Sequence, residues 1–210
     1  MASAYPTALD DLIGNQSYSD GVTVLESVHF NNWQDAIDNL QEKVGVDDSA
    51  VTSSHDYRIN RRGRQTVITT DATVSTGSTV IPLDDTKPQI TEGDEYLSRA
   101  ITPTDALNIL EIEVQFYWAT NSVNQSMIFA LFQDATADAI SAGIHKPNTA
   151  NAVHTLFYRY RMVAGTTLST TFRFRAGQAT GGTVTMDGAS GSRLLGGSMV
   201  SYMQITEWKV

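Results

Sequence analysis

Apolar residues change their spacing along this chain, from a helical repeat to a strand repeat. Within residues 29–46 they recur at alternating intervals of three and four positions. The apolar positions are Phe30, Trp33, Ile37, Leu40 and Val44. This spacing is the a/d seam of two heptads, and Gly45 follows where a glycine commonly ends a helix. The pattern predicts one helix over residues 29–46.

From Gln65 onward the apolar repeat has a period of two, which is typical of strands with one buried face. Segments rich in Gly, Pro, Asp and Ser separate the apolar stretches. The predicted strands are residues 65–70, 79–83, 95–102, 110–119, 126–134, 154–163, 168–177, 182–188 and 199–208. So many short strands without a helix between them predict a mainly β protein, with an antiparallel jelly-roll sandwich as the head over residues 65–210.

Residues 126–134 depart from this alternation. The stretch reads SMIFALFQD, with apolar side chains at consecutive positions. A strand of this kind is buried on both faces. One face belongs to the core of the sandwich, and we expect a neighbouring subunit to cover the other.

A helix of two heptads is marginal in water on its own, so its apolar seam needs a partner. Two coverings are open from the spacing: the chain's own β-domain, or copies of the same helix. The narrow a/d stripe favours self-association, since a helix facing a globular core usually has a wider apolar stripe. The large side chains of Phe30 and Trp33 suit a wide seam, which favours three helices. We therefore predict a trimeric neck.

Composition and charge exclude some classes of function but do not identify one. The chain has 210 residues, 41% of them hydrophobic, and a net charge of −9. That charge repels nucleic acid at long range, so a nucleic-acid partner is not expected. There is no cysteine, which leaves the redox compartment open. The first residues lack the basic and apolar stretches of a signal peptide, and no apolar run is long enough to enter a membrane.

A basic cluster stands out in this acidic chain. Its arginines are Arg58, Arg61, Arg62 and Arg64. They either dock on an acidic partner surface or form part of a solvated linker. We assign residues 47–64 as the linker between helix and head, and residues 1–28 as an attachment segment.

Residues 29–57 carry a resemblance to a known class of proteins. His29, Asn31, Ala36, Ile37, Leu40 and Gly45 match H-x-N-x-x-x-x-A-I-x-x-L-x-x-x-x-G, and the SAV-x-x-S-x-D-Y turn follows at residues 49–57. This arrangement resembles a segment of tailed-bacteriophage structural proteins, and the ending GGSMVSYMQITEW is similar to the last strand of trimeric TNF/C1q-like jelly-roll heads. The resemblance implies a homotrimer that attaches to the virion, is assembled in the host cytoplasm, and contacts other virion proteins through residues 1–28.

Candidate catalytic and metal sites are weak by comparison. Ser54, His55 and Asp56 are consecutive, whereas a hydrolytic triad converges from separate segments. His145 and His154 could meet across a hairpin, and the acidic residues near Asp84 have no EF-hand spacing. Aromatic residues could stack on sugars if they are exposed, and the candidates are Tyr117, Tyr158, Tyr160 and Trp208. We predict no catalytic residue, no cofactor and no metal site.

Two functions follow as hypotheses. The first is a non-enzymatic virion protein, a short trimeric fibre whose head binds a host cell-surface glycan. The second is a trimeric capsid decoration protein that stabilises the head shell, which the small size and absence of a long shaft favour. A glycan-cleaving enzyme ranks behind both, because no pair of carboxylates stands out in the sequence.

Overall fold

The computed structural model describes residues 27–45, 54–55 and 65–210. The chain divides into two units, Met1–Arg62 and Gly63–Val210. The predicted attachment segment, the arginine cluster at 58–64 and most of the predicted linker lie outside the described residues. Their roles stay predictions.

The described part of the first unit contains one helix. Helix α1 covers Ser27–Val44, and Gly45 follows it with a φ of 80°. The Gly45 N–H donates to the Gln41 carbonyl at 2.7 Å, which completes the last turn. The predicted helix and its glycine stop are therefore confirmed, since a positive φ at this position suits glycine best.

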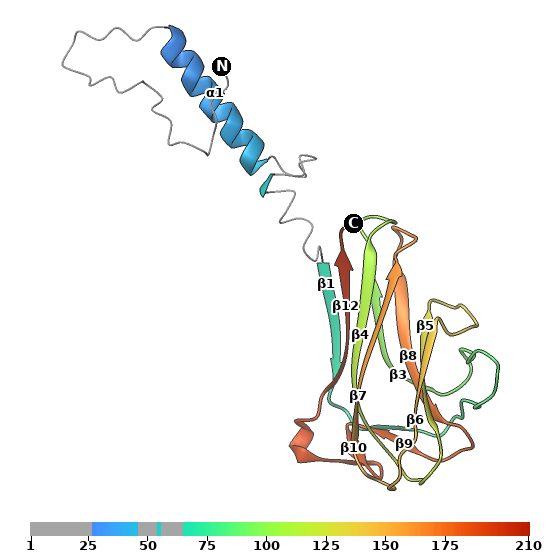
Figure 1. The fold of residues 1–210 in the computed structure, drawn as a ribbon. Helices are drawn as coiled ribbons and strands as arrows, with labels where there is room; N and C mark the ends of the chain where they lie inside the picture. The colour runs from blue at the N-terminus through green and yellow to red at the C-terminus, as the bar shows by residue number, and fades with distance from the viewer. Residues whose placement is uncertain (1–26, 46–53, 56–64) are drawn as a thin grey trace. The chain divides into compact units, whose positions relative to one another are not determined.

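The second unit is an antiparallel sandwich of two sheets (Figure 1). The long strands of the first sheet are, in spatial order, β1 (Gln65–Asp71), β12 (Ser201–Trp208), β4 (Ile109–Thr120) and β7 (His154–Val163). Two short strands, β2 (Ser75–Gly77) and β9 (Val184–Met186), extend this sheet beside the end of β4. The second sheet has the order β3 (Asp94–Ile101), β8 (Thr170–Gln178), β5 (Met127–Gln133) and β6 (Ser141–His145).

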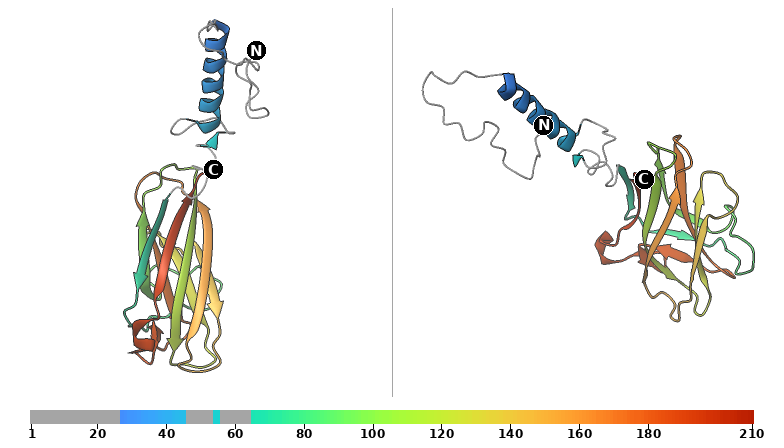
Figure 2. Two further views of the ribbon diagram at one scale, coloured as in Figure 1. Left: turned by 90° about the vertical axis from the view of Figure 1, so that its left-hand side faces the viewer. Right: turned by 45° about the horizontal axis from the view of Figure 1, so that its top comes forward.

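The strand order identifies a jelly roll. The chain passes back and forth between the sheets, so β1-β12-β4-β7 faces β3-β8-β5-β6. Most neighbouring strands are distant in sequence, and the hairpin of β5 and β6 is an exception. Figure 2 (left) looks onto the first sheet, where its four long strands lie side by side. The predicted fold class is confirmed. The short pair β10 (Gly188–Ala189) and β11 (Ser192–Arg193) and a 3-10 turn at Leu195–Gly197 precede β12.

Alternation along the strands forms the core between the sheets. Phe172 and Phe174 of β8 are fully buried, while Arg173 and Arg175 point outward and pair with Glu95 of β3. Aromatic rings fill the centre, with Phe116 of β4 and Phe174 of β8 5.2 Å apart between centroids. The other fully buried large side chains include Trp118, Phe129, Leu110, Ile112, Met127 and Leu131.

Strand β5 is buried on both faces, as the sequence predicts, but its second cover belongs to the same chain. Residues 78–93 pass over the outside of the second sheet, and Ile81 packs there against Ile128 and Phe132. The Ile81 N–H donates to the Gln178 carbonyl at 3.1 Å. The expectation of a neighbouring subunit on this face is therefore wrong.

The strand prediction needs correction at residues 79–83 and at β6. Residues 79–83 form no strand, because Pro82 lacks an N–H and the segment crosses the sheet as its cover. Strand β6, which reads SAGIH, was not predicted because small residues give it no apolar alternation.

The two ends of the sandwich differ in their connections. The chain enters at β1, whose first residue Gln65 pairs with Glu207 near the end of β12. At the opposite end, which we call the distal end, the loops at residues 121–126, 146–153 and 179–183 meet. A ligand site at the distal end therefore lies at the end of the sandwich opposite Gln65.

Candidate functional site

Three surfaces of the described residues are candidates for recognition. The first is the seam of α1, whose described side chains are Trp33, Ile37, Leu40 and Val44. Ile37, Leu40 and Val44 are each about half exposed within the single chain, at 50%, 47% and 50%. Such a row of apolar side chains on one helix face needs a covering partner. Nothing is described of the Phe30 side chain.

The second surface is the outward face of the first sheet. Phe157 of β7 is 73% exposed, Val163 of β7 51% and Ile68 of β1 47%. The register places Phe157 next to Gln115 of β4, which in turn lies next to Tyr202 of β12. The face therefore carries exposed apolar and aromatic groups across several strands.

Ion pairs lie among these apolar groups. Arg159 donates through Nε to Glu113 at 2.9 Å, and Arg161 pairs with Glu111 on the adjacent row. Glu111 is only 6% exposed, although Arg161 remains open to solvent. Ion pairs whose arginine is open to solvent add little stability, but they give the face a fixed charge pattern that can select a partner.

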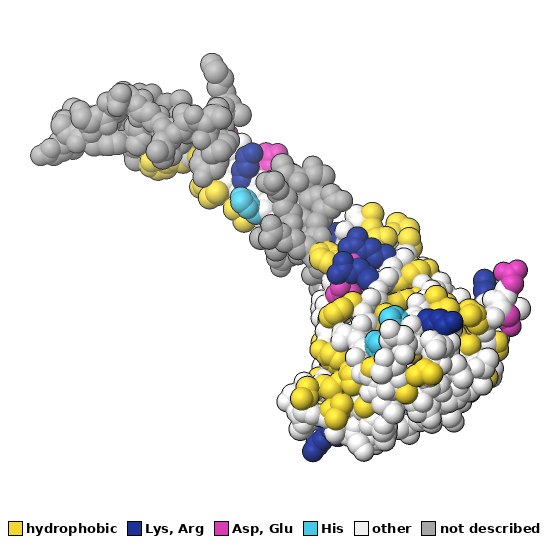
Figure 3. All heavy atoms as spheres, turned by 60° about the horizontal axis from the view of Figure 1, so that its bottom comes forward, with side chains coloured by type: hydrophobic (Ala, Val, Ile, Leu, Met, Phe, Trp, Pro, Cys, Tyr) yellow, Lys and Arg dark blue, Asp and Glu magenta, His cyan; other side chains and the backbone are white. Residues whose placement is uncertain are grey.

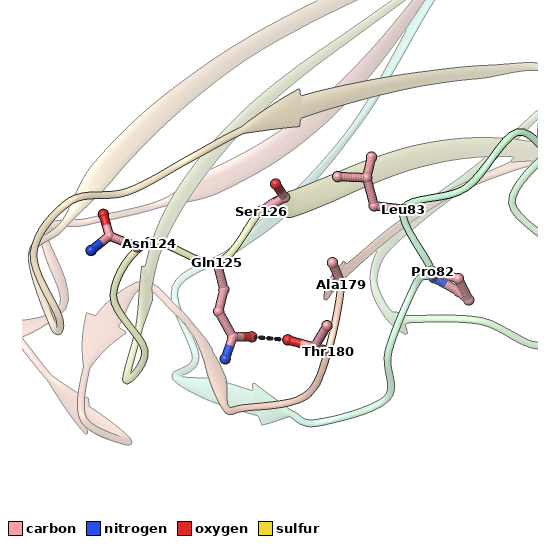
Figure 4. Close-up of a pocket in the computed structure, with 7 residues that line it drawn as sticks. All are labelled: Pro82, Leu83, Asn124, Gln125, Ser126, Ala179 and Thr180. Atoms are coloured by element: carbon pink, nitrogen blue, oxygen red, sulfur yellow. Dashed lines mark hydrogen bonds between the residues drawn. The ribbon is translucent and has the colours of Figure 1, made fainter.

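The third surface is the distal end, where the loops form two hollows. The larger hollow has a volume of about 490 Å³ and is lined by Pro82, Leu83, Asn124, Gln125, Ser126, Ala179 and Thr180. Figure 4 shows Gln125 hydrogen-bonded to Thr180 from the neighbouring loop, at 2.7 Å. The hollow combines a small apolar patch with uncharged amide and hydroxyl groups.

The second hollow has a volume of about 310 Å³. It is lined by Asn121, Asn151, Thr183, Thr185, Ser190 and Gly191. Within it, the Thr185 hydroxyl accepts a hydrogen bond from the Gly191 N–H at 3.1 Å, and Asn121 accepts one from the Thr183 N–H at 2.8 Å. Neither hollow has a charged side chain in its lining.

Backbone hydrogen bonds hold the distal loops together. The Asn124 N–H donates to the Pro147 carbonyl at 3.0 Å, and the Asn151 N–H donates to the Thr120 carbonyl at 2.7 Å. Asn124 and Asn151 both have φ near 57°, a region that asparagine tolerates better than most residues. The loops therefore present their amides and hydroxyls from a fixed framework, which suits recognition of a neutral ligand rich in hydroxyl groups.

Several residues considered from sequence take other roles. Tyr158 and Tyr160 pack on the core, and the Tyr158 hydroxyl donates to Ser141 at 2.5 Å, so neither offers a free ring for stacking on a sugar. Asp84 accepts hydrogen bonds from Thr86 within its own turn, which lowers its pKa. Among the described residues, no group of three or more His, Cys, Asp or Glu side chains is placed to hold a metal.

The hollows and Phe157 were not predicted. Their lining residues come from loops far apart in sequence, and each loop alone reads as an ordinary turn. The only local signal was the concentration of Asn, Gly, Ser and Thr between strands.

Comparison with known proteins finds no matching family model and no matching curated protein. Solved structures give distant likenesses. Eiger TNF from S. frugiperda is 9% identical over 69% of this chain and 93% of its own, with a TM-score of 0.40. The infectious bursal disease virus Gt strain structure is 11% identical over 70% of this chain and 38% of its own, with a TM-score of 0.36. The EclA C-terminal domain, a sugar-binding protein, is 16% identical over 55% of this chain and 76% of its own, with a TM-score of 0.31.

These likenesses carry no functional argument, and the jelly roll rests on the strand order above. In the part of the chain that the structure describes, no helix has the length and apolar character needed to span a membrane.

Proposed function

We propose that this chain is a non-enzymatic structural protein of a tailed-bacteriophage virion, a short homotrimeric fibre whose head binds a host cell-surface glycan. The observation that carries the proposal is the seam of α1, whose described apolar side chains lie half exposed in the single chain. Copies of the same seam would cover one another. The resemblance of residues 29–57 to phage structural proteins supports the virion location.

The outward face of the first sheet supports the same assembly. It lies on the unit that follows the neck, and it carries Phe157, Val163 and Ile68 as exposed apolar groups. Apolar side chains on a sheet face are stabilised when a second protein surface removes them from water. In the proposed trimer this face packs against a neighbouring head.

Replacing Phe157 with serine is therefore expected to weaken trimer formation. Loss of the buried ring would cost about 2 kcal/mol for each copy, equivalent to more than a tenfold change in an equilibrium constant. Analytical ultracentrifugation over a concentration series measures the change. Ile144→Ser is the matched control, because Ile144 is 58% exposed on the second sheet. Equal dissociation constants for both variants would contradict the head contact.

The distal hollows support the choice of a neutral glycan. Their linings offer amides, hydroxyls and small apolar groups, with no charge to select an anion or a cation. Figure 3 shows the distal end of the head as largely hydrophobic and uncharged polar surface. In the proposed fibre this end faces away from the virion.

Glycan binding is tested with the full chain on a panel of bacterial surface polysaccharides and on host cells. Thr185→Asp places a carboxylate in the smaller hollow and is expected to lower binding at least tenfold, while Thr167→Asp in the exposed turn after β7 leaves it unchanged. Equal binding by both variants would show that the glycan does not bind in the smaller hollow. Binding to purified capsids and not to cells would favour the capsid decoration protein over the fibre.

A further inference from the structure

Two histidines lie at the distal end between the two sheets. His145 is the last residue of β6 in the second sheet, and His154 is the first residue of β7 in the first sheet. Their ring centres are 5.0 Å apart. His154 also stacks on its cross-strand partner Trp118, with ring centres 4.7 Å apart and planes inclined by 24°. The pair therefore joins the two sheets where the sandwich opens to solvent.

The imidazole nitrogens lack partners. Nε2 of His154 is buried without a hydrogen bond, and neither histidine makes a side-chain hydrogen bond within the described residues. A buried polar nitrogen that loses water without gaining a partner costs free energy. A ligand that such a nitrogen can bind would remove this cost.

The unpartnered imidazole nitrogen favours a cation with affinity for nitrogen ligands. Figure 3 shows histidine side chains at the surface of the head, and the exposed His145 gives an ion access to the pair from solvent.

We propose that His145 and His154 together bind one divalent transition-metal ion of the Ni²⁺, Cu²⁺ and Zn²⁺ class. An imidazole nitrogen binds such an ion at about 2.1 Å, which places the metal about 3.2 Å from the ring centre. With one nitrogen of each ring directed at the ion, ring centres 5.0 Å apart subtend about 100° at the metal. This angle lies between octahedral and tetrahedral values.

Water fills the remaining coordination positions of the ion. Hard cations such as Mg²⁺ prefer oxygen ligands and are excluded by the chemistry of the pair. Because the ligands come from β6 and β7, the ion links the second sheet to the first. Metal binding therefore stabilises the distal end of the head, next to the hollows.

The test uses the full chain without a histidine tag, titrated with NiCl₂ by calorimetry at about pH 7.5. We expect one ion per chain and a rise in the melting temperature on addition of Ni²⁺, but not of Mg²⁺. His145→Asn and His154→Asn are each expected to weaken binding at least tenfold. The double variant His29→Ala with His55→Ala removes the other histidines and should bind as the natural chain does.

His154 packs on Trp118, so folding of its variant is checked separately by thermal melting without metal. His145 is exposed, and its variant keeps the proposal falsifiable even if His154→Asn fails to fold. Affinity should also fall as the pH is lowered through the titration of imidazole, because protons compete with the ion. Absence of Ni²⁺ binding at about 1 mM, or equal affinity for His145→Asn and the natural chain, would overturn the proposal.

Discussion

Replacing Glu207 with leucine is expected to lower the free energy of unfolding of the head by about 4 kcal/mol. Glu207 is fully buried in β12. One carboxylate oxygen accepts hydrogen bonds from the Thr104 N–H at 2.8 Å, the Thr104 hydroxyl at 2.6 Å and the Asn108 amide at 2.5 Å. The other accepts from the Gln65 amide at 2.8 Å. Leucine would leave the Thr104 N–H and hydroxyl without this acceptor, and the Gln65 and Asn108 amides would each lose one of two acceptors.

The carboxylate links three parts of the head. Gln65 begins β1, Thr104 and Asn108 lie in the connection from β3 to β4, and Glu207 is near the end of β12. Urea unfolding followed by tryptophan fluorescence measures the change. Glu207→Gln is the matched variant, because it keeps one acceptor oxygen and should lose about half as much stability. Equal stability of all three proteins would show that the network contributes nothing.

The same network predicts a dependence on pH. Burial alone disfavours the ionised form of Glu207, but hydrogen bonds from Thr104, Asn108 and Gln65 outweigh it and hold its pKa below the ordinary value. The folded pKa therefore lies below the unfolded value of about 4.3. Ionised Glu207 stabilises the head above that value, and this contribution is lost as the pH falls through the lower folded pKa.

Asp187 provides a control of opposite sign. Burial raises its pKa and outweighs the hydrogen bonds that it accepts from Ser201. The folded state then holds its proton more tightly than the unfolded state, so ionisation of Asp187 at neutral pH costs stability. Asp187→Asn should therefore be neutral or stabilising at neutral pH, whereas Glu207→Gln is destabilising. Asn also tolerates the φ of 56° at this position.

The strands that could be predicted are those with one face in the core and the other face in solvent. In β7 the exposure alternates at every residue, and the sequence HTLFYRYRMV alternates with it. Residues 126–134 carry no alternation, yet their lack of polar residues indicated burial on both faces. The pattern could not predict which residues cover the outer face of β5. Ile81 packs on that face from a segment that forms no strand and has no periodic signal.

The candidate sites were less accessible to sequence reasoning than the fold. The distal hollows need Asn121, Asn151 and Thr183 to converge, and their spacing along the chain gives no periodic signal. His145 and His154 are nearer in sequence, so their meeting across a connection could be considered in advance. Their ring distance and their contact with Trp118 depend on the pairing of β6 with β5 and of β7 with β4.

Substitutions in the seam of α1 are expected to have a large effect on trimer formation. Replacing Ile37 and Leu40 together with aspartate is expected to abolish the trimeric neck. Burial of these two side chains contributes about 4 kcal/mol for each chain, and the variant also places three copies of each carboxylate close together. The trimer should then dissociate at micromolar concentration, or persist through the heads alone with a lower melting temperature.

A charge-matched control separates this effect from a general effect of added acid. Asn32 and Asn39 occupy the same heptad position on the opposite side of the predicted seam. The double variant Asn32→Asp with Asn39→Asp adds the same charge to each chain and should leave the trimer intact. Sedimentation equilibrium of both variants gives the mass directly, against 22.9 kDa for the single chain.

Combining the seam variant with Phe157→Ser distinguishes the two contacts. If neck and head both hold the trimer, the triple variant should sediment as a folded monomer, since neither apolar surface retains its partner. The distal hollows would remain intact in that monomer, so it should still bind the glycan, although without the avidity of three linked heads. If the natural chain sediments as a compact monomer, the exposed seam does not direct self-association, and the proposed fibre fails with it.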